Sequence, residues 1–180
     1  MLRLILIFLF FLSNASADNR EKIIERLKNT SSINFKFEQN ISGKIENGNC
    51  VIKYPKKIFC KYEKSNDKIL VSNGKSLVIK TKTSFYRYPL KKTPLNFILD
   101  KSYLIKKIYN FEESKIDNKI INYKIFENEN EINIFFNNEN FNLLGWKIKD
   151  IYQKDSIIYI SNTKINEEIN DNIFSLPIQN

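Results

Sequence analysis

The chain has 180 residues, a formal net charge of +9 and no histidine. The length fits one domain with a sizeable core. The lack of histidine excludes Ser-His-Asp and Cys-His nucleophile systems and histidine-ligated metals, and two cysteines are too few for a structural zinc site.

Residues 1–17 have the layout of a secretory signal peptide. Arg3 precedes the apolar run Leu4–Leu12, and the small-x-small sequence ASA ends at Ala17. The apolar run is too short to span a bilayer as a helix. We therefore expect cleavage after Ala17 and an exported, soluble domain over residues 18–180.

The basic charge does not by itself predict a nucleic-acid partner. An exported protein rarely meets nucleic acid, and the lysines are spread along the chain instead of clustering. A compositional bias toward Lys, Asn and Ile explains the charge. Weak attraction to anionic lipid headgroups is the alternative.

The first predicted elements are a helix and a strand. In the sequence DNREKIIERLKN, over residues 18–29, Ile23, Ile24 and Leu27 share one helical face, and Asp18 is placed to cap it. Apolar residues then alternate with mostly polar ones from Ile33 to Ile41, which indicates a strand with one apolar face.

Most of the remaining chain keeps the strand period. Asn73-Gly74 is a strong hairpin signal, and Pro55 marks another tight turn. The predicted strands are residues 49–54, 58–62, 68–72, 76–80, 84–88, 122–128, 131–137, 143–152 and 157–165. Serial hairpins of this kind predict an antiparallel sheet that is strongly curved or nearly closed.

One segment breaks this pattern. Residues 93–111 have Pro94 at a first-turn position and apolar residues at helical spacing. We therefore expect helical pieces to interrupt the sheet midway.

Cys50 and Cys60 are expected to face each other across the Pro55 hairpin. Opposed side chains on one face of an antiparallel pair lie about 4.5–5.5 Å apart at Cβ, which approaches disulfide geometry. Export to an oxidising compartment favours the bond, and the short loop would contribute roughly 3 kcal/mol. The alternative is two small buried thiols.

The sequence contains no recognisable catalytic constellation. The paired carboxylates Glu112-Glu113 and Glu167-Glu168 are adjacent in sequence, so in strands they point to opposite faces. Hydrolase, zinc-protease and phosphate-loop motifs are missing. We expect a protein that is not an enzyme and that uses no cofactor or metal.

The ordered set of motifs resembles the periplasmic outer-membrane lipoprotein carrier protein family, the LolA family. The matching pieces are Phe37 with Gln39, Pro55 with Phe59 and Tyr62, Val71 to Lys75, Thr93 to Leu99, and Phe174 to Pro177. Each piece alone is weak, but the likeness covers nearly all of the chain after residue 17 in the right order.

The resemblance implies a mainly β fold with helices, a half-open antiparallel barrel whose apolar cavity is covered by a helical lid. Expected cavity residues are Phe35, Phe37, Ile52, Tyr54, Ile58, Tyr62, Leu77, Ile79 and Phe85. Expected lid residues are Leu95, Ile98 and Leu99. From composition alone, the aromatic side chains would be read as plain core packing.

The resemblance also implies a function, namely a monomeric periplasmic carrier of lipoprotein acyl chains. An inner-membrane lipoprotein-releasing ABC transporter would load it, and an outer-membrane acceptor would take the cargo. The absence of a lipobox cysteine favours the carrier over the acceptor. The alternative is a single-domain periplasmic carrier or sensor of another lipid or glycolipid with the same fold.

One position departs from the family pattern. The family commonly has an arginine before the hairpin proline that hydrogen-bonds the closed lid, and here that residue is Tyr54. A tyrosine hydroxyl donates one hydrogen bond and lacks the guanidinium fork. One hypothesis is that the Tyr54 hydroxyl donates to a lid carbonyl; without such a bond, the closing latch is weaker or lies elsewhere.

Overall fold

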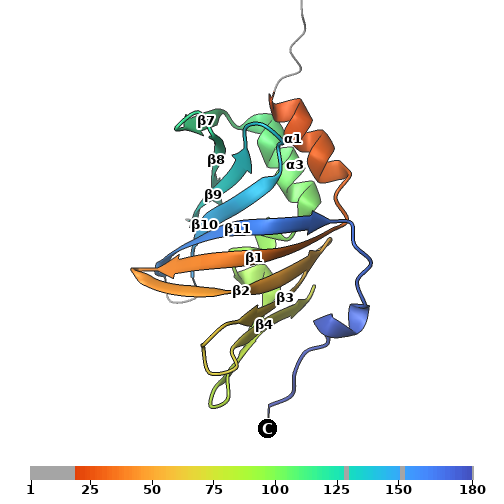
Figure 1. The fold of residues 1–180 in the computed structure, drawn as a ribbon, viewed down its shortest axis with the longest axis vertical. Coiled ribbons are helices and arrows are strands. Elements are labelled where there is room, and N and C mark those ends of the chain that lie inside the picture. Colours follow the sequence, from red (N-terminus) through yellow and green to blue (C-terminus); the bar gives the residue numbers. More distant parts are fainter. Residues whose placement is uncertain (1–18, 128–129, 151–152, 180) are drawn as a thin grey trace, which may run out of the picture.

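The computed structural model describes residues 19–127, 130–150 and 153–179. Within these ranges, eleven strands form one sheet in the order β6-β5-β4-β3-β2-β1-β11-β10-β9-β8-β7 (Figure 1). All neighbouring strands are antiparallel. The predicted fold, a curved and open antiparallel sheet with a few helices, is confirmed.

The strands of the first half of the sheet are β1 (Ser32–Ile41), β2 (Lys44–Lys53), β3 (Lys57–Tyr62), β4 (Ile69–Asn73), β5 (Ser76–Lys80) and β6 (Phe85–Pro89). Those of the second half are β7 (Glu113–Ile116), β8 (Ile120–Glu127), β9 (Asn130–Asn137), β10 (Leu143–Lys149) and β11 (Asp155–Ile165). Each half is a chain of hairpins, and the pairing of β1 with β11 joins them.

The helices are α1 (Asn19–Lys28), α2 (Leu95–Ile98) and α3 (Lys101–Asn110), with 3₁₀ turns η1 (Leu90–Lys92) and η2 (Asp171–Phe174). The helical segment predicted over residues 93–111 is thus two helices. Asp100 separates them because its backbone is extended and its side chain accepts a hydrogen bond from the Tyr103 amide, which caps α3. Among the described residues, no helix is long and apolar enough to cross a membrane.

The helices cover part of one face of the sheet. α1 and α3 lie side by side (Figure 1). Their buried residues join one core with the inward side chains of β8 and β9: Ile23, Ile24, Leu27, Leu104, Ile108, Tyr123, Ile125, Ile134 and Phe136. The second half of the sheet is therefore filled by α1 and α3, which leaves the first half as the place for a cavity.

Several boundaries differ from the sequence prediction. Strand β2 begins at Lys44, five residues before the predicted start, because its inward positions 44 and 46 hold Lys and Glu and its one apolar residue there, Ile45, is exposed. Strand β7 and the turn η2 were not predicted at all. The predicted signal peptide and the Asp18 cap lie outside the described residues.

Candidate functional site

The first half of the sheet, α2 and parts of β10 and β11 line a cavity of about 720 Å³. Its apolar wall comes from strand residues of one parity, among them Phe35, Phe37, Ile58, Leu77 and Ile79. Leu95 of α2 and Trp146 of β10 also line it. The volume falls in the range of small-molecule sites, about 300–1,000 Å³.

Six of the nine predicted cavity residues line this space: Phe35, Phe37, Ile58, Tyr62, Leu77 and Ile79. The other three do not. Ile52 is fully buried opposite Ile58, within the core and not on the cavity wall. Phe85 pairs with Lys80, whereas its neighbour Tyr86 pairs with Ile79 and lines the cavity. The predicted alternation was therefore one residue out of register in β6.

Of the three predicted lid residues, Leu95 lines the cavity. Ile98 and Leu99 are fully buried in the core. The lid, defined here as residues Thr93–Leu99, also presents Thr93 and Pro94 to the cavity. One turn of α2 thus forms part of the cavity wall, while its C-terminal end anchors it.

Tyr54 does not bond the lid in the expected way. Its hydroxyl is buried and has no hydrogen-bond partner among the described residues. Burial raises the pKa of the hydroxyl well above its ordinary value. The Lys101 ammonium lies 5.8 Å from the centroid of the Tyr54 ring. The predicted hydroxyl-to-lid hydrogen bond is therefore wrong.

The neighbouring Lys56 makes the contacts that Tyr54 was expected to make. Its backbone N–H donates to the Leu99 carbonyl at 2.8 Å. Its ammonium pairs with the Asp100 carboxylate at 3.1 Å. The Ser72 hydroxyl donates to the Lys56 carbonyl at 2.9 Å and so fixes the turn from β4. The β2–β3 turn is thereby tied to the end of the lid.

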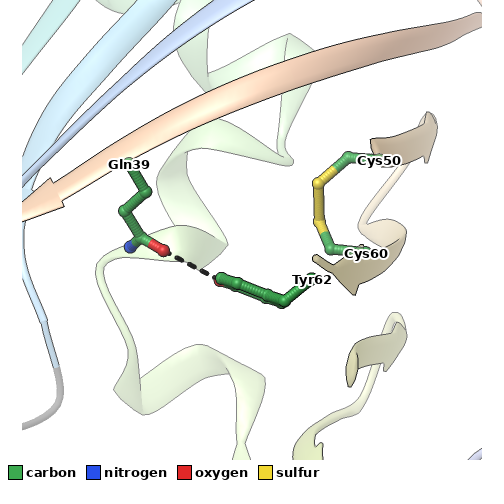
Figure 2. Close-up of a disulfide and its surroundings, with 4 residues drawn as sticks. All are labelled: Gln39, Cys50, Cys60 and Tyr62. Atoms are coloured by element: carbon green, nitrogen blue, oxygen red, sulfur yellow. Dashed lines mark hydrogen bonds between the residues drawn. A yellow bond between two sulfur atoms is a disulfide. The ribbon is translucent and has the colours of Figure 1, made fainter. Parts of the chain in front are cut away.

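The predicted disulfide between Cys50 and Cys60 is present and lines the cavity (Figure 2). The two residues are directly opposed in the β2–β3 ladder, as the hairpin centred on Pro55 predicted. Each is about 4 % exposed. The disulfide cross-links β2 and β3 in this part of the cavity wall.

Gly48 creates room for two aromatic rings beside the disulfide. It is opposed by Phe37 on one side and by Tyr62 on the other. These two rings meet edge to face with centroids 5.0 Å apart. A Cβ at residue 48 would lie 2.7 Å from the Phe37 ring and would also clash with the Lys61 carbonyl. Glycine is therefore required for this packing.

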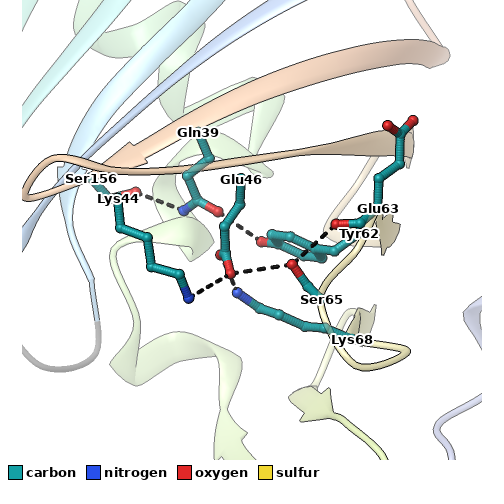
Figure 3. A network of polar contacts seen from close by, with 8 residues as sticks. All are labelled: Gln39, Lys44, Glu46, Tyr62, Glu63, Ser65, Lys68 and Ser156. Atoms are coloured by element: carbon teal, nitrogen blue, oxygen red, sulfur yellow. Dashed lines mark hydrogen bonds and ion pairs between the residues drawn. The ribbon is translucent and has the colours of Figure 1, made fainter.

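Beyond the rings, the cavity wall becomes polar (Figure 3). The Tyr62 hydroxyl donates to Oε1 of Gln39 at 2.9 Å, and Nε2 of Gln39 donates to the Ser156 hydroxyl at 2.8 Å. These bonds connect β3, β1 and β11 across the concave face. All three side chains are buried.

An ion cluster lies next to this chain of hydrogen bonds. The Glu46 carboxylate accepts from Lys68 at 2.6 Å and from Lys44 at 3.1 Å. The Lys68 ammonium also lies 4.0 Å from the centroid of the Tyr62 ring. Burial raises the pKa of Glu46, but the hydrogen bonds and charges of Lys68 and Lys44 outweigh it, so the pKa lies below its ordinary value. The carboxylate is charged at neutral pH.

The cavity can hold apolar chains and hydrogen-bond one polar group. Among the residues that the structure describes, no group of three or more His, Cys, Asp or Glu side chains is placed to hold a metal ion. The buried carboxylate of Glu46 is neutralised by two lysines. These features suit the binding of a ligand that has apolar chains and a polar group.

Sequence reasoning missed most of the polar wall. Gln39 was noted as a motif residue but not as a cavity residue, although it occupies an apolar position in the alternation of β1. Glu46 likewise occupies an inward, buried position in the alternation of β2. Ser156 and Trp146 carry no such signal, because their place depends on strand pairing far along the chain.

Comparison with known families agrees with the resemblance seen in the sequence. The family model for outer membrane lipoprotein carrier protein LolA matches residues 22–177. A comparison with curated proteins gave no significant match.

Solved structures resemble this chain at very low identity. An uncharacterised conserved protein from Thermus thermophilus has a TM-score of 0.52 at 8 % identity, covering 90 % of this chain and 94 % of that chain. A LolA superfamily protein from Nitrosomonas europaea has a TM-score of 0.48 at 11 % identity, with coverages of 88 % and 96 %. The lipoprotein LppX of Mycobacterium tuberculosis has a TM-score of 0.45 at 12 % identity, with coverages of 84 % and 95 %. The first likeness shows a shared fold alone, and the other two are distant likenesses only.

Proposed function

Because the chain belongs to the outer membrane lipoprotein carrier protein family, LolA, we propose that it carries lipoprotein acyl chains across the periplasm in its concave cavity. The observation that carries the proposal is the cavity of about 720 Å³, apolar beneath α2 and polar toward the β1–β2 turn. An amphiphile with its chains inward and its head outward fits this gradient.

The energetics of burial support a carrier with a closing device. Each buried CH₂ is worth about 0.8 kcal/mol, so one long acyl chain gains on the order of 10 kcal/mol. A carrier must nearly match the membrane and still release the chain. A lid whose own apolar side chain, Leu95, occupies the cavity wall competes with the cargo. Closure of the lid then favours release.

The tie between Lys56 and the lid is proposed to hold the closed state. It replaces the family's arginine by a backbone hydrogen bond to Leu99 and an ion pair to Asp100. Cargo that enters beneath α2 has to break these contacts. The resulting cost offsets part of the affinity for the acyl chain.

The proposed partners and location follow from the family. Export by the segment 1–17 would place the protein in the periplasm. There, an inner-membrane ABC transporter would load it and an outer-membrane acceptor would unload it. All three proteins would bind the acyl chains of the lipoprotein.

Trp146 provides a direct test, because it is the chain's single tryptophan and it lines the cavity. A synthetic triacylated lipopeptide with brominated acyl chains should quench its fluorescence on binding, whereas the same lipopeptide without bromine should not. Saturable quenching is the expected result. No quenching by any acylated ligand would contradict the proposal, and quenching by brominated phospholipid alone would favour a carrier of another lipid.

Two neighbouring residues of β5 provide a test variant and its matched control for this quenching experiment. Ile79 lines the cavity, whereas Lys80 lies on the other face of the strand. Ile79→Asn places a polar amide on the cavity wall and should weaken quenching severalfold. Lys80→Asn should leave it unchanged.

A further inference from the structure

The concave face changes from apolar to polar in steps along the strands. From the end tied to the lid toward the β1–β2 turn, successive cross-strand pairs are Ile52–Ile58, Cys50–Cys60, Gly48–Tyr62, Gln39–Glu46 and Ile41–Lys44. Gln39 thus lies where the wall stops being apolar, directly opposite Glu46 of the charged cluster. An amphiphile lying along the strands would place the junction of chain and head here.

Two hydrogen-bond donors at this level have no acceptor in the described part of the chain. A primary amide has two N–H groups and a serine hydroxyl has one O–H. The amide of Gln39 uses one N–H for Ser156, and the Ser156 hydroxyl serves there as the acceptor. One N–H of Gln39 and the O–H of Ser156 are left to donate.

A third donor comes from the second half of the sheet. Ile158 of β11 is opposed by Gln39 on one side and by Trp146 on the other, so the three residues form one row. Trp146 is about 1 % exposed, and its Nε1 has no partner within the described ranges. A buried N–H without an acceptor is unfavourable, which makes this row a place where an incoming acceptor gains binding energy.

We propose that Gln39, Ser156 and Trp146, here called the donor collar, bind the carbonyl oxygens of the ester or amide linkages that join acyl chains to their head. The proposal rests on the acyl-chain carrier function proposed above and names the part of the cargo that the wall recognises. The collar offers donors to a ligand that accepts, and an ester carbonyl accepts without donating. The acyl chains then extend past the disulfide toward the lid.

The test compares two lipids that differ only in these carbonyls. A short-chain, water-soluble phosphatidylglycerol with brominated acyl chains has two ester carbonyls, and its dialkyl ether counterpart has none. Both are titrated into the purified protein while Trp146 fluorescence is followed. The ester lipid should bind about threefold to tenfold more tightly, which corresponds to one ordinary hydrogen bond.

Variants then separate recognition from folding. Gln39→Met/Tyr62→Phe removes the amide donor together with the hydroxyl that Gln39 accepts, so no buried donor is stranded. The ester preference should fall in this variant, because Ser156 and Trp146 alone remain as donors of the collar. Tyr62→Phe alone keeps every donor of the collar and should keep the preference. Ser156→Ala, which removes the second donor by the smallest change, should reduce it if the double variant does not fold.

The outcomes are distinguishable. If wild type binds ester and ether lipids equally, or if Gln39→Met/Tyr62→Phe and Ser156→Ala both retain the preference, the collar does not recognise carbonyls and the inference is overturned while acyl-chain binding stands. If neither lipid nor the lipopeptide quenches Trp146, the carrier function fails and the inference fails with it. A purely structural role for Gln39 would change both affinities together and leave their ratio unchanged, which also overturns the inference.

Discussion

The hydroxyl groups of Tyr54 and Tyr62 are both buried, but they differ in whether they are hydrogen-bonded. The Tyr62 hydroxyl donates to Gln39, whereas that of Tyr54 is buried without a partner among the described residues. A buried donor left unpaired costs about 1–3 kcal/mol, and a satisfied one contributes about 0.5–1.5 kcal/mol. The two positions therefore predict opposite effects for one substitution.

We expect Tyr54→Phe to raise the free energy of unfolding by about 1 kcal/mol, because it removes the unpaired hydroxyl and keeps the ring. Tyr62→Phe should lower the free energy of unfolding by about 1 kcal/mol, because it leaves an acceptor of Gln39 unused. Urea denaturation of both variants beside wild type measures the difference. A destabilised Tyr54→Phe would mean that the hydroxyl has a partner after all.

Glu46 predicts a dependence of stability on pH. Its pKa lies below the ordinary value of 4.5, since the lowering by Lys68 and Lys44 outweighs the opposing effect of burial. The folded protein thus binds this proton less readily than the unfolded chain does. The stabilisation is fully present above pH 4.5 and is lost as the pH falls through the lower, folded-state pKa.

Glu46→Gln removes this titration. The difference in unfolding free energy between wild type and Glu46→Gln should be constant near neutral pH and shrink as the pH falls toward about 3. Denaturation curves at a series of pH values measure it. A difference that stays the same over the whole range would contradict the assignment.

At the scale of elements, the presence of the strands could be predicted from the sequence, but their exact ends and register could not. Alternation identified β1, and Asn73-Gly74 and Pro55 located two hairpins, because these signals are local. The predicted β2 was too short because its first inward positions hold Lys44 and Glu46, and β6 was predicted one residue out of register. The helical period of residues 93–111 did not reveal that Asp100 would end one helix and cap the next.

The lid is held to the β2–β3 turn by an ion pair that a single substitution can remove. The Lys56–Asp100 ion pair is about one third exposed on the lysine side, and exposed pairs contribute up to about 1 kcal/mol. Lys56→Gln removes the charge but keeps the backbone bond to Leu99 and the Asp100 cap of α3. We expect hydrogen exchange in residues 95–99 to accelerate up to about fivefold.

Lys82→Gln is the matched control for this experiment. Lys82 pairs with Asp67 in an exposed turn of the first half of the sheet, at a position that does not line the cavity. Its substitution should leave exchange in the lid unchanged. Equal exchange in Lys56→Gln and wild type would show that the ion pair does not hold the lid.

For the whole molecule, the sequence predicted a cavity but not its chemistry. The apolar half of the wall follows from side chains of one parity in consecutive hairpins, which is local information. The polar half depends on the bond between Gln39 and Ser156, whose positions are 117 residues apart. Only the pairing of β1 with β11 brings them together, and no signal in either strand specifies that partner.

The same pairing has a consequence for how the protein folds. Strands β1 and β11 lie side by side in the middle of the sheet, although they come from opposite ends of the described chain (Figure 1). Each half of the sheet can form from hairpin contacts between sequence neighbours. The pairing of β1 with β11 has a large loop-closure entropy and therefore forms slowly. Until β11 arrives, β1 is an open edge able to pair with other chains. The cavity is therefore completed last, and a chain that emerges from its N-terminus onward has to remain protected from aggregation until its final long strand is free to dock.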